Sequence, residues 1–231
     1  MSGDEIALNV VVEAACTLLL LTQGSTKVFK TRPYSLAGLD DGKRTLQTLS
    51  MTIEAEALLL LLPSPVTCFA KASYTQVQTF HLISATSSLV LLDSYTSGRM
   101  ARGEEWSFDS YRSTNEIYIL GKQVAKDALL LENNYRQFVH PYSCYATLFL
   151  FGAKTLSLLH HFKAEFHKIV QYKSRTMPGL IWSFSELEKG TGGIVRVAAT
   201  RTESVKEWLQ EQCQSLESLI GKDAYRHAWT G

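Results

Sequence analysis

The sequence predicts a mostly β protein built from stacked antiparallel sheets, with two α-helices in the C-terminal half. Three observations support this fold class. Short apolar runs recur at a spacing of about 12 residues through the first half of the chain. Residues 75–81 alternate between two faces, as a half-buried strand does. Helical three- and four-residue spacing is confined to the second half.

Most of the predicted strands are short apolar runs with polar or proline residues at their ends. Such runs are typical of strands buried on both faces, although the pattern alone does not distinguish them from a buried helix. They lie at Val10–Val12, Leu18–Leu21, Leu58–Leu62 and Leu89–Leu92. In the alternating segment, one face carries Gln76, Gln78 and Phe80 and the other carries Val77, Thr79 and His81.

Further strands are predicted in the middle of the chain. They are Trp106–Phe108, Ile117–Leu120 and Val124–Leu131, and the polar segment 111–115 is interpreted as a break between the first two. Because no helical pattern alternates with these strands, the sequence favours stacked sheets over βαβ units.

Two helices are predicted after the strands. The first carries an apolar stripe of Leu156, Leu159, Phe162, Phe166 and Ile169. The second begins with a capping box of Thr200 and Glu203, ends at Gly221, and buries Val205, Leu209, Leu216 and Ile220. A strand pair, Leu180–Phe184 and Ile194–Ala198, lies between the helices. Since no linker is apparent, we expect one domain over 1–231, β-rich over 1–132 and helix-containing over 133–231.

Composition excludes several classes of protein. The 231 residues include 23 basic and 22 acidic ones, so the net charge of +1 argues against a nucleic-acid-binding protein. The apolar runs are far shorter than the ~20 residues that span a bilayer. Asp4 and Glu5 do not fit a secretory signal. We therefore expect a cytoplasmic protein that contacts neither nucleic acid nor membrane.

The cysteines give no sign of a metal or redox centre. Cys16, Cys68, Cys144 and Cys213 are scattered, and no CxxC motif occurs. Buried free thiols are favoured for a cytosolic chain, while two disulfides remain an alternative.

No motif for catalysis is present. The sequence lacks GxSxG, HExxH and an EF-hand loop. Gly98 and Gly103 have the spacing of a phosphate loop, but Glu104 and Glu105 follow them, and two carboxylates would repel a phosphate. We therefore expect a protein that is not an enzyme.

The histidines provide one candidate metal site. His160, His161 and His167 fall opposite the apolar stripe of the first predicted helix. His161 and Glu165 are four residues apart, a spacing at which both side chains can bind one divalent metal ion. The alternative is a solvated polar face with a weak side-chain pair.

The segment from Gly98 to Trp106 is the candidate partner-binding loop. Gly98 and Gly103 permit positive φ and close approach, Arg99 and Glu104 can pair across the loop, and Trp106 can anchor it. A recognition surface for another protein is one interpretation, and a tight strand connection is the other.

Four segments, in order, resemble the UreD family of urease accessory proteins, called UreH in some systems. They are Gly3-Asp4, residues 21–29 (LTQGSTKVF), residues 62–69 (LPSPVTCF), and residues 96–99 (TSGR) followed by 103–108 (GEEWSF). Each segment is weak alone, but their order and spacing are specific. The tail, residues 193–197 followed by an amphipathic helix, is also similar to the end of this family.

The resemblance implies a β-helix-like, two-layer fold and a role without catalysis. Members of the family bind urease apoprotein and UreF, and through UreF the GTPase UreG, in an assembly that delivers nickel to the urease active site. The resemblance therefore implies a metallochaperone scaffold with no tightly bound cofactor and only transient Ni²⁺. It also implies that Arg99, Gly98, Gly103, Glu104 and Trp106 lie at a partner-facing loop.

Two departures from the family pattern leave alternatives open. The family usually carries strands before the Gly3-Asp4 segment, and this sequence apparently lacks them, so a neighbouring edge is expected to be uncovered. Pro63-Ser64-Pro65 replaces a Pro-Gln-Pro-like pattern, a mild change because the prolines remain. A shortened, inactive relative of UreD is one alternative, and a metal-dependent enzyme on a β-sandwich is a weaker one.

Overall fold

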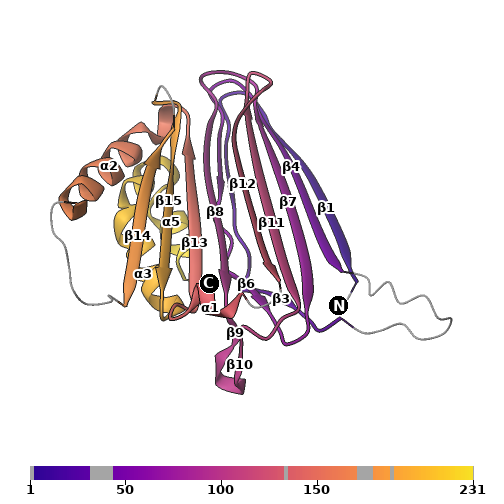
Figure 1. Ribbon diagram of the computed structural model, residues 1–231. Coiled ribbons are helices and arrows are strands. Elements are labelled where there is room, and N and C mark those ends of the chain that lie inside the picture. The colour runs from indigo at the N-terminus through magenta and orange to yellow at the C-terminus, as the bar shows by residue number, and fades with distance from the viewer. Residues whose placement is uncertain (1–2, 32–43, 133–134, 171–178, 188–189, 231) are drawn as a thin grey trace.

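The computed structural model describes residues 3–31, 44–132, 135–170, 179–187 and 190–230. These residues form three layers, which lie side by side in Figure 1. A five-stranded sheet (sheet A) faces an eight-stranded sheet (sheet B), and helices cover the other face of sheet B. The prediction of a mostly β, two-layer fold with helices in the C-terminal half is confirmed.

Sheet A runs in the order β1 (Glu5–Val12), β4 (Thr45–Ile53), β7 (Ser73–Leu82), β11 (Ser110–Ile119), β12 (Lys122–Glu132). The first four strands pair in parallel and in register, and only β11 and β12 form an antiparallel hairpin. β1 is an edge strand, and its Ile6 and Leu8 are exposed.

Sheet B runs in the order β14 (Leu180–Glu186), β15 (Gly192–Ala199), β13 (Cys144–Phe151), β8 (Ser88–Thr96), β5 (Leu58–Leu61), β2 (Thr17–Leu20). β6 (Val66–Cys68) also pairs with β8 and carries β3 (Thr26–Val28). The pairs among β2, β5 and β8 are parallel, whereas β13, β15 and β14 continue the sheet antiparallel.

The prediction of antiparallel sheets is therefore wrong for the first half of the chain. Up to β11 the chain passes alternately through sheet A (β1, β4, β7, β11) and sheet B (β2 and β3, β5 and β6, β8), so it coils from one layer to the other. Each return to a sheet comes after one full turn of the coil, so strands of the same sheet run in the same direction. This coil is the β-helix-like arrangement that the family resemblance implies.

Sheet B is buried on both faces, which explains its apolar runs. All four leucines of β5 are buried. Leu58 and Leu60 pack toward the helices, and Leu59 and Leu61 pack toward sheet A. Leu18–Leu20 are only partly buried because β2 is the edge strand of this sheet.

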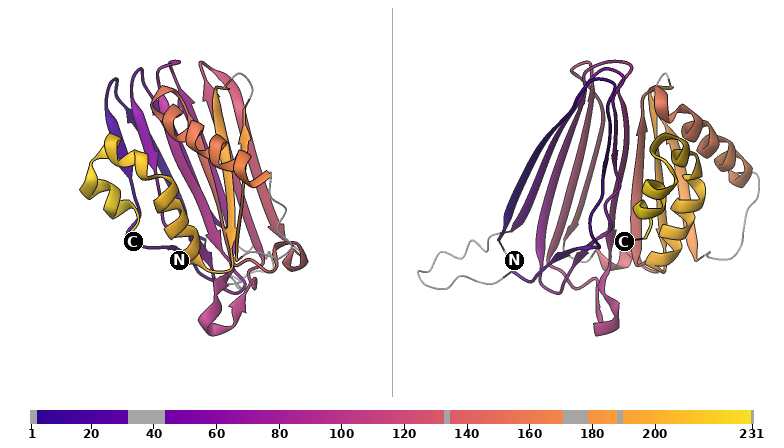
Figure 2. Two further views of the ribbon diagram at one scale, coloured as in Figure 1. Left: turned by 90° about the vertical axis from the view of Figure 1, so that its left-hand side faces the viewer. Right: turned by 180° about the vertical axis from the view of Figure 1, so that it is seen from behind.

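The helices cover the outer face of sheet B, as the two further views show (Figure 2). They are α2 (Leu156–Val170), α3 (Thr202–Gln212), α4 (Glu217–Ile220) and α5 (Lys222–Ala228). The short α1 (Arg136–Val139) instead contributes Val139 to an aromatic cluster between the two sheets, which includes Tyr74, Trp106 and Tyr111. No helix of the described ranges is long and apolar enough to cross a bilayer.

The second predicted helix is wrong in its start and its continuity. It begins at Thr202 after an Arg201 N-cap that makes no side-chain capping bond. The backbone N–H of Thr200 instead donates to Gly179, because Thr200 follows the end of β15. The helix breaks at Cys213 into η4 (Gln214–Leu216) and α4, and Gly221 separates α4 from α5.

Two further sequence predictions are corrected by the structure. Residues 106–108 form a connection rather than a strand, and residues 111–115 lie inside β11 rather than in a break. All four cysteines are free, as expected, but Cys16 is exposed while Cys68, Cys144 and Cys213 are buried.

Replacing Leu60 tests the double burial of sheet B. We expect Leu60→Ala to lower the free energy of unfolding by about 3 kcal/mol, because it leaves a cavity between sheet B and the helices. Leu130→Ala on β12, where the side chain is 44% exposed, is the control and should cost less than about 1 kcal/mol. Urea denaturation measures both, and equal losses would contradict the assignment.

Candidate functional site

The predicted partner-binding loop is a small hairpin that projects from one end of the sandwich (Figure 1). It consists of β9 (Gly98–Arg99), η1 (Met100–Arg102) and β10 (Glu104–Glu105). At the tip, Met100 is 53% exposed. The hairpin is therefore accessible to another protein.

Arg99 and Glu104 lock the hairpin. Arg99 Nε donates to Glu104 Oε2 at 2.7 Å, and its Nη2 donates to the other carboxylate oxygen. The guanidinium also lies over the Phe69 ring, 3.9 Å from its centroid. The hydrogen bond from Arg99 lowers the pKa of Glu104, which the backbone N–H of Ala70 further stabilises as a carboxylate. These contacts hold the loop in one conformation.

The two glycines of the loop have different roles. Gly98 has a φ of 116°, and a Cβ atom there would lie 2.4 Å from the carbonyl oxygen of Glu104. Gly103 has a φ of 72°, with no atom within 4 Å of the position of a Cβ. Gly98 thus serves close packing, whereas Gly103 serves only the left-handed turn.

Trp106 lies at the base of the hairpin and is only 5% exposed. Its ring packs edge-on against Tyr95, Phe108, Tyr135 and Tyr145. Its side chain therefore anchors the loop to the body of the protein. Contact of this loop with a partner protein stays a prediction.

His161 and Glu165 lie on the exposed face of α2, in the outer layer of the molecule. His161 Nε2 lies 2.9 Å from Gln212 Oε1, and Glu165 accepts a hydrogen bond from Lys168 Nζ at 2.5 Å. No group of three potential metal ligands was found in the described part of the chain. The metal role of this pair stays a prediction, and its neighbours supply no third ligand.

A belt of polar side chains crosses the otherwise apolar space between the sheets. On sheet A it has two lateral rows, which follow from the register of the strands. One row is Gln47, Gln76 and Ser113, and the other is Gln78, Asn115 and Asp127. On the facing side, β8, β13, β15 and β14 align Asp93, Thr147, Arg196 and Ser183. We call these residues the polar belt.

Asp93 is the centre of the polar belt. Its carboxylate accepts hydrogen bonds from Ser113 Oγ and Asn115 Nδ2, both at 2.7 Å, and from Gln76 Nε2 at 3.1 Å. Burial raises the pKa of Asp93, and the three hydrogen bonds only partly oppose this. Asp93 is thus a partly buried carboxyl group whose hydrogen-bond partners all belong to the facing sheet.

Two buried polar atoms beside Asp93 have no hydrogen-bond partner among the described residues. They are Asn115 Oδ1 and Tyr111 Oη. Buried polar atoms of this kind are normally satisfied by internal water. The interior around Asp93 therefore suits water and ions better than an apolar ligand.

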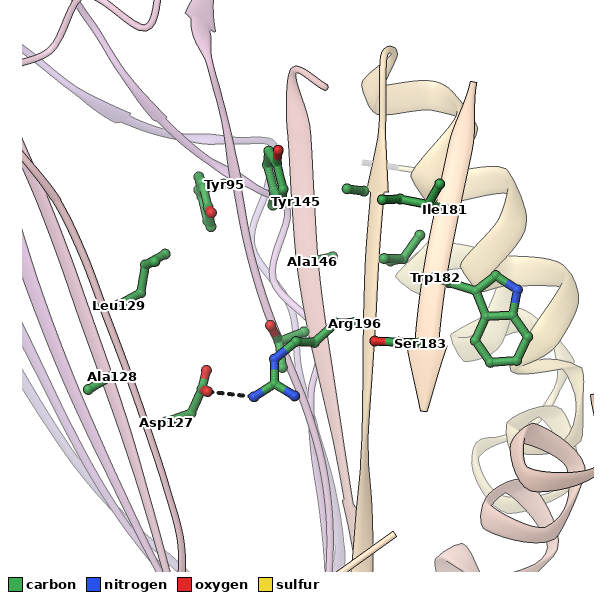
Figure 3. Close-up of a pocket in the computed structure, with 13 residues that line it drawn as sticks. Tyr95, Asp127, Ala128, Leu129, Tyr145, Ala146, Ile181, Trp182, Ser183 and Arg196 are labelled. Atoms are coloured by element: carbon green, nitrogen blue, oxygen red, sulfur yellow. Dashed lines mark hydrogen bonds and ion pairs between the residues drawn. The ribbon is translucent and has the colours of Figure 1, made fainter. Parts of the chain in front are cut away.

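Pockets on two flanks of the sandwich meet the polar belt. One, of about 170 Å³, lies toward β1 and β2 and is lined by Gln47, Gln76, Gln78 and Asp93. The other, of about 350 Å³, lies between β12 and the strands β13, β15 and β14 (Figure 3). Thr147, Asp127 and Arg196 line it, and Figure 3 shows Asp127 and Arg196 facing each other across the gap.

No role for the polar belt was predicted from the sequence. The alternation correctly placed Gln76 and Gln78 on one face with Phe80, and the structure shows that this face is buried. That observation was the available signal, because an amide on a core face requires a polar partner. Ser113 and Asn115 were missed because a polar segment inside a buried strand has the pattern of a turn.

A family model described as the UreD urease accessory protein matches residues 1–230. The chain belongs to the UreD family. "Urease accessory protein D" of Arabidopsis thaliana is 34% identical over 97% of this chain and 82% of its own length. "Urease accessory protein 4" of Cryptococcus neoformans is 33% identical over 96% and 77%. "Urease accessory protein UreD" of Anaeromyxobacter is 32% identical over 97% and 72%.

Family membership agrees with two expectations from the sequence. The resemblance to UreD is confirmed over nearly the whole chain. The relatives are named as accessory proteins rather than enzymes, in keeping with a UreD protein that carries out no catalysis of its own.

The two loop glycines provide a matched pair of variants. Gly103→Ala should lower the free energy of unfolding by about 1 kcal/mol, the cost of a left-handed backbone with a Cβ atom. Gly98→Ala should cost at least about 2 kcal/mol, because the backbone of Glu104 must also move. Chemical denaturation measures both losses, and a smaller loss for Gly98→Ala would refute the close-packing role.

The raised pKa of Asp93 predicts how stability depends on pH. Asp93 keeps its proton to a higher pH in the folded state than in the unfolded state. The free energy of unfolding therefore falls as the pH rises from the ordinary aspartate pKa of 3.8 to the raised pKa of the folded state. Stability of the wild type relative to Asp93→Asn should therefore fall as the pH rises through this window. Urea denaturation of both proteins between pH 4 and 8 measures it, and a pH-independent difference would contradict the prediction.

Proposed function

We propose that this chain is a scaffold for urease maturation that provides Ni²⁺ with a path through its interior. In this proposal it binds urease apoprotein and UreF, and through UreF the GTPase UreG, in the cytoplasm. UreG hydrolyses GTP, and the chain positions the other proteins and holds the ion only transiently. Membership of the UreD family and the names of its relatives support this role.

The polar belt is the observation that carries the proposal. It crosses a core that is apolar on one side and aromatic on the other, and it meets a pocket on each flank. An apolar interior of the same shape would be at least as stable as this buried row of polar groups. The presence of the polar row therefore indicates a functional role. The polar side chains of the belt are suited to the passage of a hydrated cation.

The chemistry of the belt favours transit over storage. Its donors are carboxylate, amide and hydroxyl oxygens, whereas strong nickel sites in proteins use imidazole or thiolate ligands. The amides and hydroxyls around Asp93 are neutral, so they can replace water around the ion without adding a second charge there. Weak binding allows release to urease. We therefore expect the isolated chain to bind Ni²⁺ with a Kd above about 1 μM.

The hairpin at 98–105 is the proposed contact with a partner. Its locked Arg99–Glu104 pair and exposed Met100 offer a rigid, partly apolar surface, which lowers the entropy cost of binding. Pull-down with urease apoprotein and with UreF tests this contact. Met100→Glu should weaken association with at least one of them, while Leu120→Glu at the opposite end of the sandwich should not.

Asp93→Asn tests the interior route. In cells that lack their own UreD-family protein, we expect this variant to lower the nickel content of urease at least tenfold while it still assembles with urease and UreF. Asp223→Asn, on the exposed side of α5, is the control and should match the wild type. Normal nickel loading by folded Asp93→Asn would rule out the route, and failure of the wild type itself would favour an inactive relative.

A further inference from the structure

The ion pair between Arg196 and Asp127 joins the two sheets at one flank of the sandwich. Arg196 Nη2 donates to Asp127 Oδ1 at 2.7 Å across the larger pocket (Figure 3). Asp127 belongs to β12, the edge strand of sheet A, and Arg196 belongs to β15 of sheet B. Among the described residues, they are the only charged side chains that line this pocket.

The pair stands where the polar belt reaches solvent. Asp127 lies opposite Asn115 in the strand register, and Asn115 donates to Asp93. Arg196 lies opposite Thr147, which lies opposite Asp93. Neighbouring strands are about 4.8 Å apart, so two strand spacings separate Asp93 from Arg196 along sheet B. The carboxylates of Asp93 and Asp127 also interact. Burial is the main cause of the raised pKa of Asp93 and its hydrogen bonds lower it, and the negative charge of Asp127 raises it further.

Arg196 places a fixed positive charge at this exit. A guanidinium keeps its charge at any pH that the folded protein tolerates. It therefore repels a divalent cation approaching from either side, and it occupies the carboxylate that such a cation would bind. In the part of the chain that the structure describes, Arg196 is the only basic residue that lines either pocket.

The Arg196 side chain can also move away from Asp127. Its side chain is 45% exposed, against 27% for Asp127, so the head group is already partly hydrated and gains further hydration when it turns toward solvent. The pair lies at an edge rather than in the core, and β14 beyond it presents Ile181 and Ser183 to solvent. Displacement of the guanidinium therefore requires no rearrangement of the sheets.

We propose that the Arg196–Asp127 pair is a gate for divalent cations at this end of the polar belt. In the closed state Arg196 neutralises Asp127 and excludes ions. In the open state Arg196 turns outward and Asp127 becomes a carboxylate ligand next to Asp93. No covalent bond changes, and the exchange is one of counter-ions. The inference rests on the proposed nickel route and adds the residue that controls it.

A purely structural ion pair is the competing explanation, and it makes a different prediction. A strut between the sheets would contribute to stability in the same way whichever partner is removed. A gate is asymmetric, because loss of Arg196 frees a carboxylate while loss of Asp127 removes it. Ion binding by the two single variants therefore separates the explanations.

The experiment measures Ni²⁺ binding to the isolated full chain by equilibrium dialysis at fixed ionic strength. We expect Arg196→Gln to bind Ni²⁺ at least tenfold more tightly than the wild type. Asp127→Asn and the double variant should show no such gain. Lys126→Gln is the matched control, because it removes the same charge from a Glu116 pair on the outer face of β12. Thermal unfolding confirms that each variant is folded.

The outcomes distinguish the gate from the route on which it rests. Unchanged Ni²⁺ binding by folded Arg196→Gln, or an equal gain in the double variant or in Lys126→Gln, would overturn the gate. If Asp93→Asn still blocked nickel loading of urease in that case, the route would stand without a gate. Normal loading with Asp93→Asn would instead remove the route, and dialysis would then report only a surface cation site.

Discussion

In-register pairing of parallel strands is the constraint on which the rest of this structure depends. Because β4, β7 and β11 pair without an offset, residues at equivalent positions form straight lateral rows. Rows of Met51, Phe80 and Ile117 therefore make an apolar layer, and rows that contain Gln76 and Ser113 make a polar one. A shift of one residue in any strand would turn each row toward the opposite face.

The second constraint is that sheet B has neighbours on both faces. Helices α2 and α3 cover one side and sheet A covers part of the other, so leucine runs such as β5 have no solvent-facing side. Sheet B is wider than sheet A, and the strands β15 and β14 extend past the edge strand β12. This mismatch in width creates the flank pocket and leaves Arg196 and Asp127 at its opening.

In the proposed function, the two candidate sites have different roles. The 98–105 hairpin is rigid and external, and its buried Trp106 couples it to the aromatic cluster below the polar belt. The belt is internal and oxygen-rich, with Asp93 at its centre. The proposed scaffold role requires an outer surface for partner proteins, which we assign to the hairpin, and a hydrated route for the ion, which we assign to the polar belt. His161 and Glu165 lie on the far side of sheet B and belong to neither.

The sequence alone determined the β-rich class, the Arg99–Glu104 loop and, through motif order, the UreD family. Burial on both faces was predicted correctly for Leu58–Leu62 and Leu89–Leu92, but wrongly for Val10–Val12 and Leu18–Leu21, which lie in or beside edge strands and are partly exposed. Periodicity reports which face a residue occupies, and Gln76, Gln78 and Phe80 show that this information was correct. It does not report which strand lies alongside. Parallel pairing, the union of Asp93 with Ser113 and Asn115, and the contact of Asp127 with Arg196, 69 residues away, were decided only by the coiling of the chain between two sheets.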